Sequence, residues 1–171
     1  MLHSEGIRRL GGRGTCVGLI VVASSVVLAA PAAAVVHSKE LSAPSPPAAG
    51  HYSIQLSGRE VPEGGDPDGQ GAAKLDLNPQ QETACFSISW SGLRGEVTAL
   101  HLHQAAQGNE GPHWIDFFNN QHFPGSNSMA SGCVPAARDK INAVINNPSA
   151  YYLNLHSTAF EKGALRGQLT P

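Results

Sequence analysis

Short stretches of alternating apolar and polar residues recur along the chain from residue 51 onward. Successive side chains of a β-strand point to opposite faces, so this alternation predicts strands with one buried face. The predicted strands are residues 52–56, 73–77, 84–90, 99–103, 114–118, 151–156 and 163–169. Clusters rich in Gly, Asp, Asn and Pro lie between them and predict turns. Seven or eight short strands at this spacing predict an all-β fold, a Greek-key β-sandwich or flattened barrel.

One segment has the spacing of a helix instead of a strand. Ile141, Val144 and Ile145 fall at positions i, i+3 and i+4, which share one side of a helix. Pro135 suits the first helical turn, where its missing N–H costs nothing, and Pro148 ends the helix. We therefore expect one short helix immediately before the penultimate strand, with a loop rich in Gly, Ser and Asn ahead of it.

The first 34 residues are typical of an export signal. Three arginines within the first 13 residues precede an apolar run over residues 17–30, and three consecutive alanines end at Ala34. This order predicts a secretory signal peptide over residues 1–34. A membrane-spanning helix needs about 20 apolar residues, and this run is shorter and ends at Pro31. We expect a secreted protein, extracellular or held in the cell envelope, with no transmembrane segment in the mature chain.

Composition separates a linker from a domain in the rest of the chain. Residues 35–50 are rich in Pro and Ala without apolar periodicity and predict a flexible linker. Residues 51–171 are long enough for one domain with its own core. Removing the signal takes three arginines and one glutamate from the chain's 11 basic and 13 acidic residues, which leaves a net charge of −4 with histidine neutral. A mildly acidic chain without basic clusters is not expected to bind nucleic acid.

Cysteine usage agrees with export. Cys16 lies within the predicted signal, so the mature chain keeps only Cys85 and Cys133. Two cysteines in an oxidising compartment most often form one disulfide. No CxxC spacing indicates a zinc or redox use for them. We therefore predict a disulfide between Cys85 and Cys133.

Histidines on two predicted strands are the candidate chemistry. In residues 99–103, Leu100 and Leu102 share one face, so His101 and His103 share the other. In residues 151–156, His156 lies on the face opposite the leucines. If these two strands are close in one sheet, three imidazoles converge on a patch outside the core. Such a site suits copper or zinc.

Two further histidines are candidate metal ligands, and two polar residues have a structural interpretation. His113 and His122 lie in the long segment that follows the first histidine strand and can supply a fourth ligand. The other interpretation is structural, with the histidines hydrogen-bonded so that they fix strand register. Asn154 and Arg166 are interpreted in the same way, and Arg166 is expected to pair with an acidic residue of segment 60–68.

Other chemistries find no support in the sequence. The loop that holds Ser128 and Ser131 has no nucleophile-elbow context, so no hydrolase is expected. The glycine-rich stretches lack the Lys-Ser/Thr pair of a phosphate-binding loop. Asp66 and Asp68, in the turn before the second strand, are expected to be solvated turn residues. No catalytic residue is assigned.

Several motifs occur in an order that resembles one known family. They are residues 56–62 (LSGREVP), 98–103 (TALHLH), 108–112 (GNEGP), 151–157 (YYLNLHS) and 163–169 (GALRGQL). They resemble L-S-G-x-E-V-P, A-H-I-H, G-x-x-G-P, Y-V-N-V-H-T and G-E-I-R-G-Q-L of the CHRD domain, a module repeated in chordin and widespread in secreted bacterial proteins. The resemblance runs from about residue 52 to residue 169.

The resemblance implies a β-sandwich related to Cu/Zn superoxide dismutase, whose copper-binding strand also carries His-x-His. The zinc loop of that enzyme is not recognisable here, and no histidine follows His156. The leading expectation is a non-enzymatic binding or structural role outside the cell, with an extracellular protein or surface partner and a metal held by histidine. The alternative is a copper-dependent, dismutase-like enzyme that uses His101, His103 and His156 together with His113.

Overall fold

The structure is a computed structural model, which describes residues 48–126 and 128–171. Its elements in chain order are β1 (Gly50–Ser57), η1 (Gly58–Glu60), β2 (Gln70–Asn78), β3 (Thr83–Ser91), β4 (Val97–Gln104), β5 (His113–Phe118), β6 (Ser128–Pro135), α1 (Arg138–Asn146), η2 (Pro148–Ala150), β7 (Tyr151–Ser157) and β8 (Phe160–Gln168). The predicted signal peptide and most of the predicted linker lie outside the described residues. Among those described, no helix is long and apolar enough to cross a membrane.

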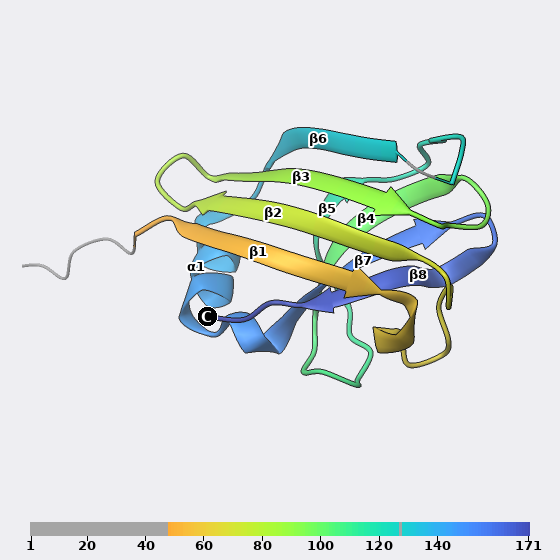
Figure 1. Ribbon diagram of the computed structural model, residues 1–171. Helices are drawn as coiled ribbons and strands as arrows, with labels where there is room; N and C mark the ends of the chain where they lie inside the picture. Colours follow the sequence, from red (N-terminus) through yellow and green to blue (C-terminus); the bar gives the residue numbers. More distant parts are fainter. Residues whose placement is uncertain (1–47, 127) are drawn as a thin grey trace, which may run out of the picture. The chain divides into compact units, whose positions relative to one another are not determined.

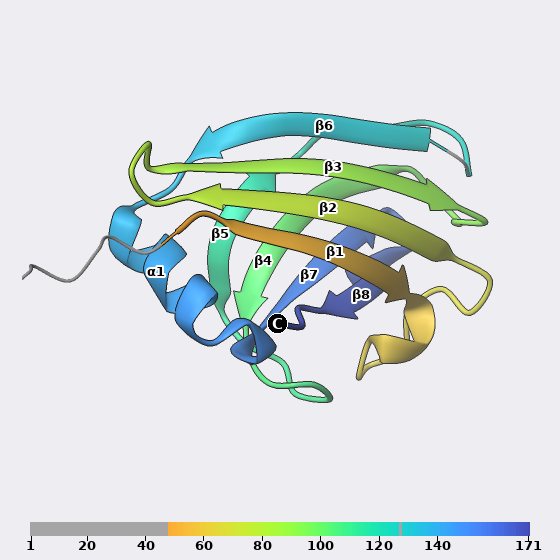
Figure 2. The same ribbon diagram turned by 60° about the vertical axis from the view of Figure 1, so that its left-hand side comes forward.

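Eight antiparallel strands form one nearly closed sheet in the order β5-β4-β7-β8-β1-β2-β3-β6. The sheet folds into two layers, with β1, β2, β3 and β6 facing β4, β5, β7 and β8 (Figures 1 and 2). The layers join where β8 meets β1, at the single pair Ser57–Arg166. The short helix α1 covers one end, before the penultimate strand. The predicted all-β fold and the position of its helix are thus confirmed.

The core lies between the two layers. Leu100 and Leu102 of β4 point inward, and so do Leu153 and Leu155 of β7; all four side chains are fully buried. They meet a face of the opposite layer formed by residues such as Leu75, Leu77 and Ile88. The alternation in the sequence therefore identified the buried face of each of these strands, and the histidines lie on the opposite, outer face.

Two details around the helix differ from the sequence prediction. The segment that was expected to be a Gly/Ser/Asn loop forms β6, which pairs with β3 from Trp90–Ser128 to Thr83–Pro135. Pro135 ends that strand, and α1 begins later, at Arg138. β6 is mostly exposed and carries few large apolar side chains, so its backbone pairing, and not a hydrophobic pattern, makes it a strand.

The outer face of β7 is covered, although β7 is a strand of a two-layer sheet. Every residue of β7 is buried, on both faces. Two loops cause this. The turn before β2 reaches β8, where Asp66 N donates to Ala164 O at 2.9 Å. The loop between β4 and β5 reaches it too, where Gln168 Nε2 donates to Ala105 O at 3.0 Å. The outer face of the β4–β7–β8 region is therefore buried as well.

Asp66 anchors the first of these loops, contrary to the expectation that it is solvated. Its side chain is fully buried, and its Oδ2 accepts a hydrogen bond from Arg94 N at 2.7 Å. Its Oδ1 accepts from Asp68 N at 3.3 Å and from the Arg94 side chain at 3.3 Å. Burial alone would raise the pKa of Asp66, but the hydrogen bonds from Arg94 and Asp68 outweigh it and lower that pKa.

Replacing Asp66 is expected to destabilise the fold. In Asp66→Ala, the backbone N–H of Arg94 loses its acceptor, and we expect a loss of about 2 kcal/mol in the free energy of unfolding. The exposed neighbour gives the matched control, because Asp68→Ala is expected to change that free energy by less than about 0.5 kcal/mol. Equilibrium unfolding in urea measures both. Equal effects of the two substitutions would contradict the anchoring role.

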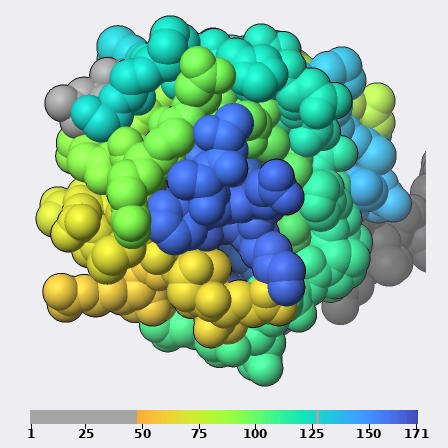
Figure 3. Space-filling view, turned by 90° about the vertical axis from the view of Figure 1, so that its right-hand side faces the viewer, coloured from red at the N-terminus to blue at the C-terminus, as the bar shows by residue number. Residues whose placement is uncertain are grey.

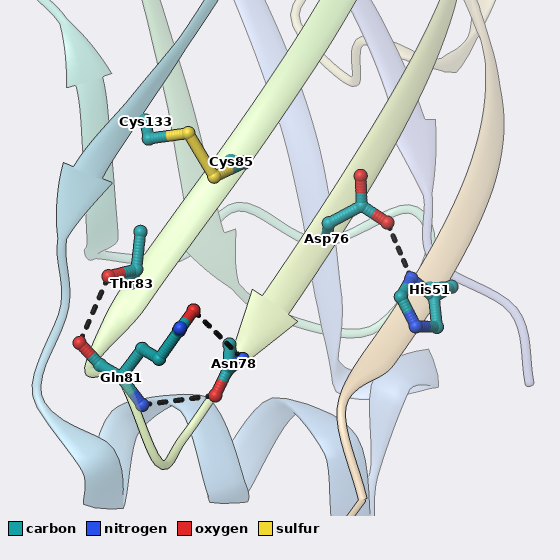
Figure 4. The surroundings of a disulfide bond; sticks show 7 residues. All are labelled: His51, Asp76, Asn78, Gln81, Thr83, Cys85 and Cys133. Atoms are coloured by element: carbon teal, nitrogen blue, oxygen red, sulfur yellow. Dashed lines mark hydrogen bonds and ion pairs between the residues drawn. A yellow bond between two sulfur atoms is a disulfide. The ribbon is translucent and has the colours of Figure 1, made fainter.

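The predicted disulfide is present. Cys85 of β3 and Cys133 of β6 are bonded across directly paired positions of the two strands, over a separation of 48 residues. Figure 4 shows the bridge near the turn that joins β2 to β3, where Gln81 N donates to Asn78 Oδ1 at 3.0 Å and Thr83 Oγ1 donates to Gln81 O at 3.0 Å. The bond therefore ties the outermost strand of one layer to its neighbour.

Candidate metal centre

Strands β4 and β7 are neighbours, and they bring three histidines together on the outer face. His101 and His103 come from β4, and His156 comes from β7. The His101 ring centre lies 5.6 Å from that of His103 and 4.9 Å from that of His156. One ring nitrogen from each of the three lies within 4.8 Å of the other two. All three side chains are buried, because the covering loops close over this part of the sheet.

Each ring is oriented by one hydrogen bond to a neutral oxygen. His103 Nδ1 donates to Gly111 O at 2.9 Å, and His156 Nδ1 donates to Glu161 O at 2.9 Å. His101 Nε2 lies 2.5 Å from Asn119 Oδ1. An oxygen of this kind can only accept, so the nitrogen that faces it carries the proton. The other nitrogen of each neutral ring therefore has a free lone pair.

The three free nitrogens have no hydrogen-bond partner among the described residues. They are His101 Nδ1, His103 Nε2 and His156 Nε2, and all are buried. A buried acceptor without a partner is costly, and three in one place require a common explanation. An imidazole that donates through one nitrogen and offers the other is the usual arrangement of a metal-ligating histidine.

The protonation states fit the same interpretation. The pKa of His101 is lowered to about 4, chiefly by burial and also by the neighbouring imidazoles of His156 and His113, against the opposing hydrogen bond to Asn119. Burial also lowers the pKa of His103 and of His156. Neutral imidazole is the form that binds metal ions. The three rings are thus held in the binding form at neutral pH.

His113, the expected fourth ligand, lies beside this cluster but makes a different contact. Its ring centre is 4.0 Å from that of His101 and 4.6 Å from that of His103. Its Nδ1 lies 2.9 Å from Asp116 Oδ1, and both side chains are about half exposed. Together with His101 they form a second group of candidate ligand atoms within 4.8 Å of one another. His122 is not brought to the site and pairs with Glu96 instead.

Bulges in β5 place His113 and Asp116 on the same face. Residues three apart in a regular strand point to opposite faces. Here the pairing with β4 shifts twice, so that His103 pairs with His113 and His101 pairs with Asp116. Bulges of this kind often re-aim side chains next to functional sites. Asp116 is therefore a site residue that alternation in the sequence could not reveal.

The remaining site residues that sequence reasoning missed act through backbone or amide oxygens. Gly111 and Glu161 contribute carbonyl groups, and Asn119 contributes its side-chain amide. A backbone acceptor leaves no residue-type signal in a sequence. Only the GNEGP motif, which places Gly111 in the loop after the histidine strand, indicated that this segment lies near the site.

A pocket of about 330 Å³ leads to the cluster from the surface. It is lined by His103, His113, Tyr152, Asn154, His156 and Arg166, with charged residues from the covering loops at its rim. In Figure 3 the β7–β8 turn (blue), the segment after η1 (yellow) and the segment from the β4–β5 loop into β5 (green to teal) meet on one face of the molecule. His103 and His156 therefore lie in the wall of this pocket, although their free nitrogens are buried.

The donor set fits copper or zinc. Imidazole nitrogen is a ligand for both metals. Two nitrogens bound to one ion lie at most about 4.2 Å apart, because each bond is about 2.1 Å long. One ring nitrogen of each of the three histidines lies within 4.8 Å of the others, which is somewhat wider than this limit.

Comparison with known proteins gives one positive result. The family model of the CHRD domain matches residues 52–169. This range includes all the histidines of the site and every strand of the sheet, apart from the first two residues of β1. The comparison with curated proteins and the comparison with solved structures each found no match. The expected kinship with Cu/Zn superoxide dismutase therefore remains an expectation from the sequence.

Proposed function

Because this chain belongs to the CHRD domain family, we propose that it is a secreted, non-enzymatic binding or structural protein that holds a copper or zinc ion through His101, His103 and His156. Because these histidines come from β4 and β7, a bound ion would tie the two strands together. His113 is the candidate fourth ligand, since its ring already contacts those of His101 and His103. The rest of the surface serves an extracellular protein or surface partner.

One observation carries the metal site. Three neutral, buried imidazoles each keep one unpartnered nitrogen, and one ring nitrogen of each lies within 4.8 Å of the other two. A purely structural histidine cluster, the alternative from the sequence, would use both nitrogens of each ring in hydrogen bonds. Here each ring uses one. A bound cation removes the cost of three unsatisfied acceptors at once.

Secretion is supported by two independent features. The segment at residues 1–34 has the charge, apolar run and small residues of a signal peptide. The Cys85–Cys133 disulfide is typical of proteins in an oxidising compartment. CHRD domains are extracellular modules, which agrees with both. Fusion of residues 1–34 to a reporter enzyme tests export directly, and retention of the reporter in the cytoplasm would contradict it.

Metal loading tests the site. The full chain, exposed to Cu²⁺ or Zn²⁺ and then dialysed, is expected to retain about one ion per chain. His103→Ala removes one ligand and is expected to weaken binding at least about 100-fold, since loss of even an outer-shell partner costs 10- to 100-fold. Elemental analysis measures the stoichiometry, and competition with a chelator of known affinity measures the binding constant.

An exposed histidine supplies the control. His51 lies on the surface and contacts Asp76, so His51→Ala is expected to retain the ion with unchanged affinity. Equal loss in His51→Ala and His103→Ala would indicate nonspecific surface binding. Absence of any retained ion in the unaltered chain would refute the metal site and leave the histidines a structural role.

The pocket favours a second candidate, a copper-dependent enzyme of the dismutase type. A purely structural ion needs no opening, whereas this pocket reaches His103 and His156. A copper ion supplies one-electron chemistry when bound, and the chain's own residues would admit a small substrate and exclude larger ones. Superoxide consumption by the copper-loaded chain, absent in His103→Ala, would favour this candidate. A loaded but inactive chain supports the binding protein.

A further inference from the structure

Arg166 is a buried cation without a carboxylate partner. Its side chain is 1% exposed. Its guanidinium donates to Asn109 O at 2.7 Å, to Ala106 O at 3.0 Å and to Gln168 Oε1 at 3.1 Å. All three acceptors are neutral, and the ion pairs of the described residues do not include Arg166. The expected ion pair with an acidic residue of segment 60–68 is therefore not formed, and carboxylates act on Arg166 only at longer range, from Glu60 and Glu110.

This charge lies next to the histidine cluster, with one ring between them. The guanidinium carbon is 3.5 Å from the centre of the Tyr152 ring. The same ring stacks on His103, with 5.0 Å between ring centres and 12° between planes. Because β7 lies between β4 and β8 in the sheet, Tyr152 separates Arg166 from His103. All three side chains are buried, so the charge acts through protein and is poorly screened by water.

The surroundings of the cluster are otherwise neutral. Each ligand ring is oriented by a carbonyl or amide oxygen and not by a carboxylate. Carboxylates in that position are common around divalent ions, where they make the histidines more basic. The nearest carboxylate, Asp116, is 3.9 Å from His101 Nε2 but is half exposed and occupied by His113.

The carboxylates at the mouth of the pocket do not replace that missing charge. Glu63, Glu110 and Glu161 line the pocket and are exposed to solvent. Glu63 is also paired with Lys162. Charges on the surface are screened by water and salt, whereas the buried guanidinium is not.

Given the metal site proposed above, on which this inference rests, we propose that the cluster selects monovalent copper, Cu(I), over Cu(II) and Zn(II), and that the charge of Arg166 sets this selectivity. Repulsion between Arg166 and the ion grows in proportion to the charge of the ion. A divalent ion therefore pays twice the penalty of a monovalent one in a site with neutral ligands. Imidazole is a copper ligand in general, and the filled d shell of Cu(I) requires no particular geometry from three donors.

Affinity measurements on the full chain test the selectivity. Cu(I) is supplied anaerobically with ascorbate and competed against bicinchoninate, while Cu(II) and Zn(II) are competed against chelators of their own. We expect the chain to bind Cu(I) at least about tenfold more tightly than either divalent ion. Equal or tighter binding of a divalent ion overturns the selectivity and leaves the metal site standing. Failure to bind any of the three ions overturns both.

Variants of two residues test the role of the charge. In Arg166→Gln we expect the ratio of Cu(I) to Cu(II) affinity to fall about tenfold, which lowers the Cu(II)/Cu(I) potential by about 59 mV. Arg166→Lys keeps a charge and is expected to keep most of the ratio. Asp116→Asn removes the nearest carboxylate and is expected to raise the potential. Because Asp116 is on the surface, this variant remains informative if Arg166→Gln does not fold. An unchanged potential in Arg166→Gln, or in Asp116→Asn where Arg166→Gln does not fold, overturns the role of the charge.

Discussion

Loss of the Cys85–Cys133 bridge is expected to lower the free energy of unfolding by about 4 kcal/mol. The bridge closes a loop over a sequence separation of 48 residues, and its absence gives the unfolded chain more conformational freedom. The native state offers little compensation, because β6 is mostly exposed and buries few large apolar side chains. The double variant Cys85→Ala, Cys133→Ala, unfolded in guanidinium chloride, measures the effect.

Reduction of the unaltered chain is the matched experiment, because it opens the same bond without a change of sequence. Both forms should show a similar loss, and amide hydrogen exchange should increase most in β6. An unchanged midpoint in both would mean that strand pairing with β3 alone holds β6 in place. Rapid exchange spread evenly over all eight strands would show that the bridge stabilises the whole sheet and not its edge.

The metal-free chain is expected to lose stability as the pH falls from about 7 to about 4. The pKa of His101 is about 4 in the folded chain and about 6.5 in an unfolded chain. Between these values the unfolded chain binds more protons, so acid favours unfolding. The contribution of neutral His101 to the free energy of unfolding is fully present above about pH 6.5 and is lost as the pH falls to about 4. For this residue the loss is about 3 kcal/mol, and His103 and His156 act in the same direction.

Urea unfolding at a series of pH values, with metal removed by a chelator, measures this dependence. His101→Gln cannot take up the proton and should flatten the curve between about pH 6.5 and pH 4. His122→Gln alters an exposed histidine and should leave the curve as it is. Asp66 contributes at lower pH, because its pKa is lowered and its stabilisation is lost as the pH falls from the pKa of the unfolded chain through that lowered pKa. An identical slope in both histidine variants would contradict the assignment to the buried cluster.

The fold could be predicted from the sequence wherever one face of a strand packs on the core. Alternation identified β4 and β7 and assigned their leucines inward and their histidines outward, which the structure confirms. The disulfide followed from the count of cysteines outside the predicted signal peptide. These inferences succeed because side-chain direction in a strand has a period of two residues.

The features that the sequence did not predict depend on contacts between distant residues, which leave no periodic pattern in the sequence. β6 was expected to be a loop because Ser and Gly dominate it, and only its pairing with β3 makes it a strand. Asp66 was expected in solvent because turn residues usually are, but Arg94 meets it from a distant part of the chain. Arg166 was expected to find a carboxylate and instead binds the carbonyl groups of a loop.

The candidate site divides in the same way. The face shared by His101 and His103 follows from alternation within one strand. The approach of His113 and Asp116 follows from bulges in β5, which no pattern of apolar residues encodes. Their proximity results from the pairing between two strands, so it cannot be predicted from the sequence of one strand alone.

Two of the three imidazoles are aligned by peptide groups, and this has a consequence for how the protein can change over time. The carbonyl at position 161 stays in place whichever side chain the residue carries. The amino acid at this exposed position can therefore vary without loss of the hydrogen bond. The amino acid at position 111 cannot vary in this way, because a methyl group on Gly111 would lie 1.9 Å from Gln104 O. Among natural variants of this chain, ring alignment should therefore tolerate diversity at the first position and depend on glycine at the second.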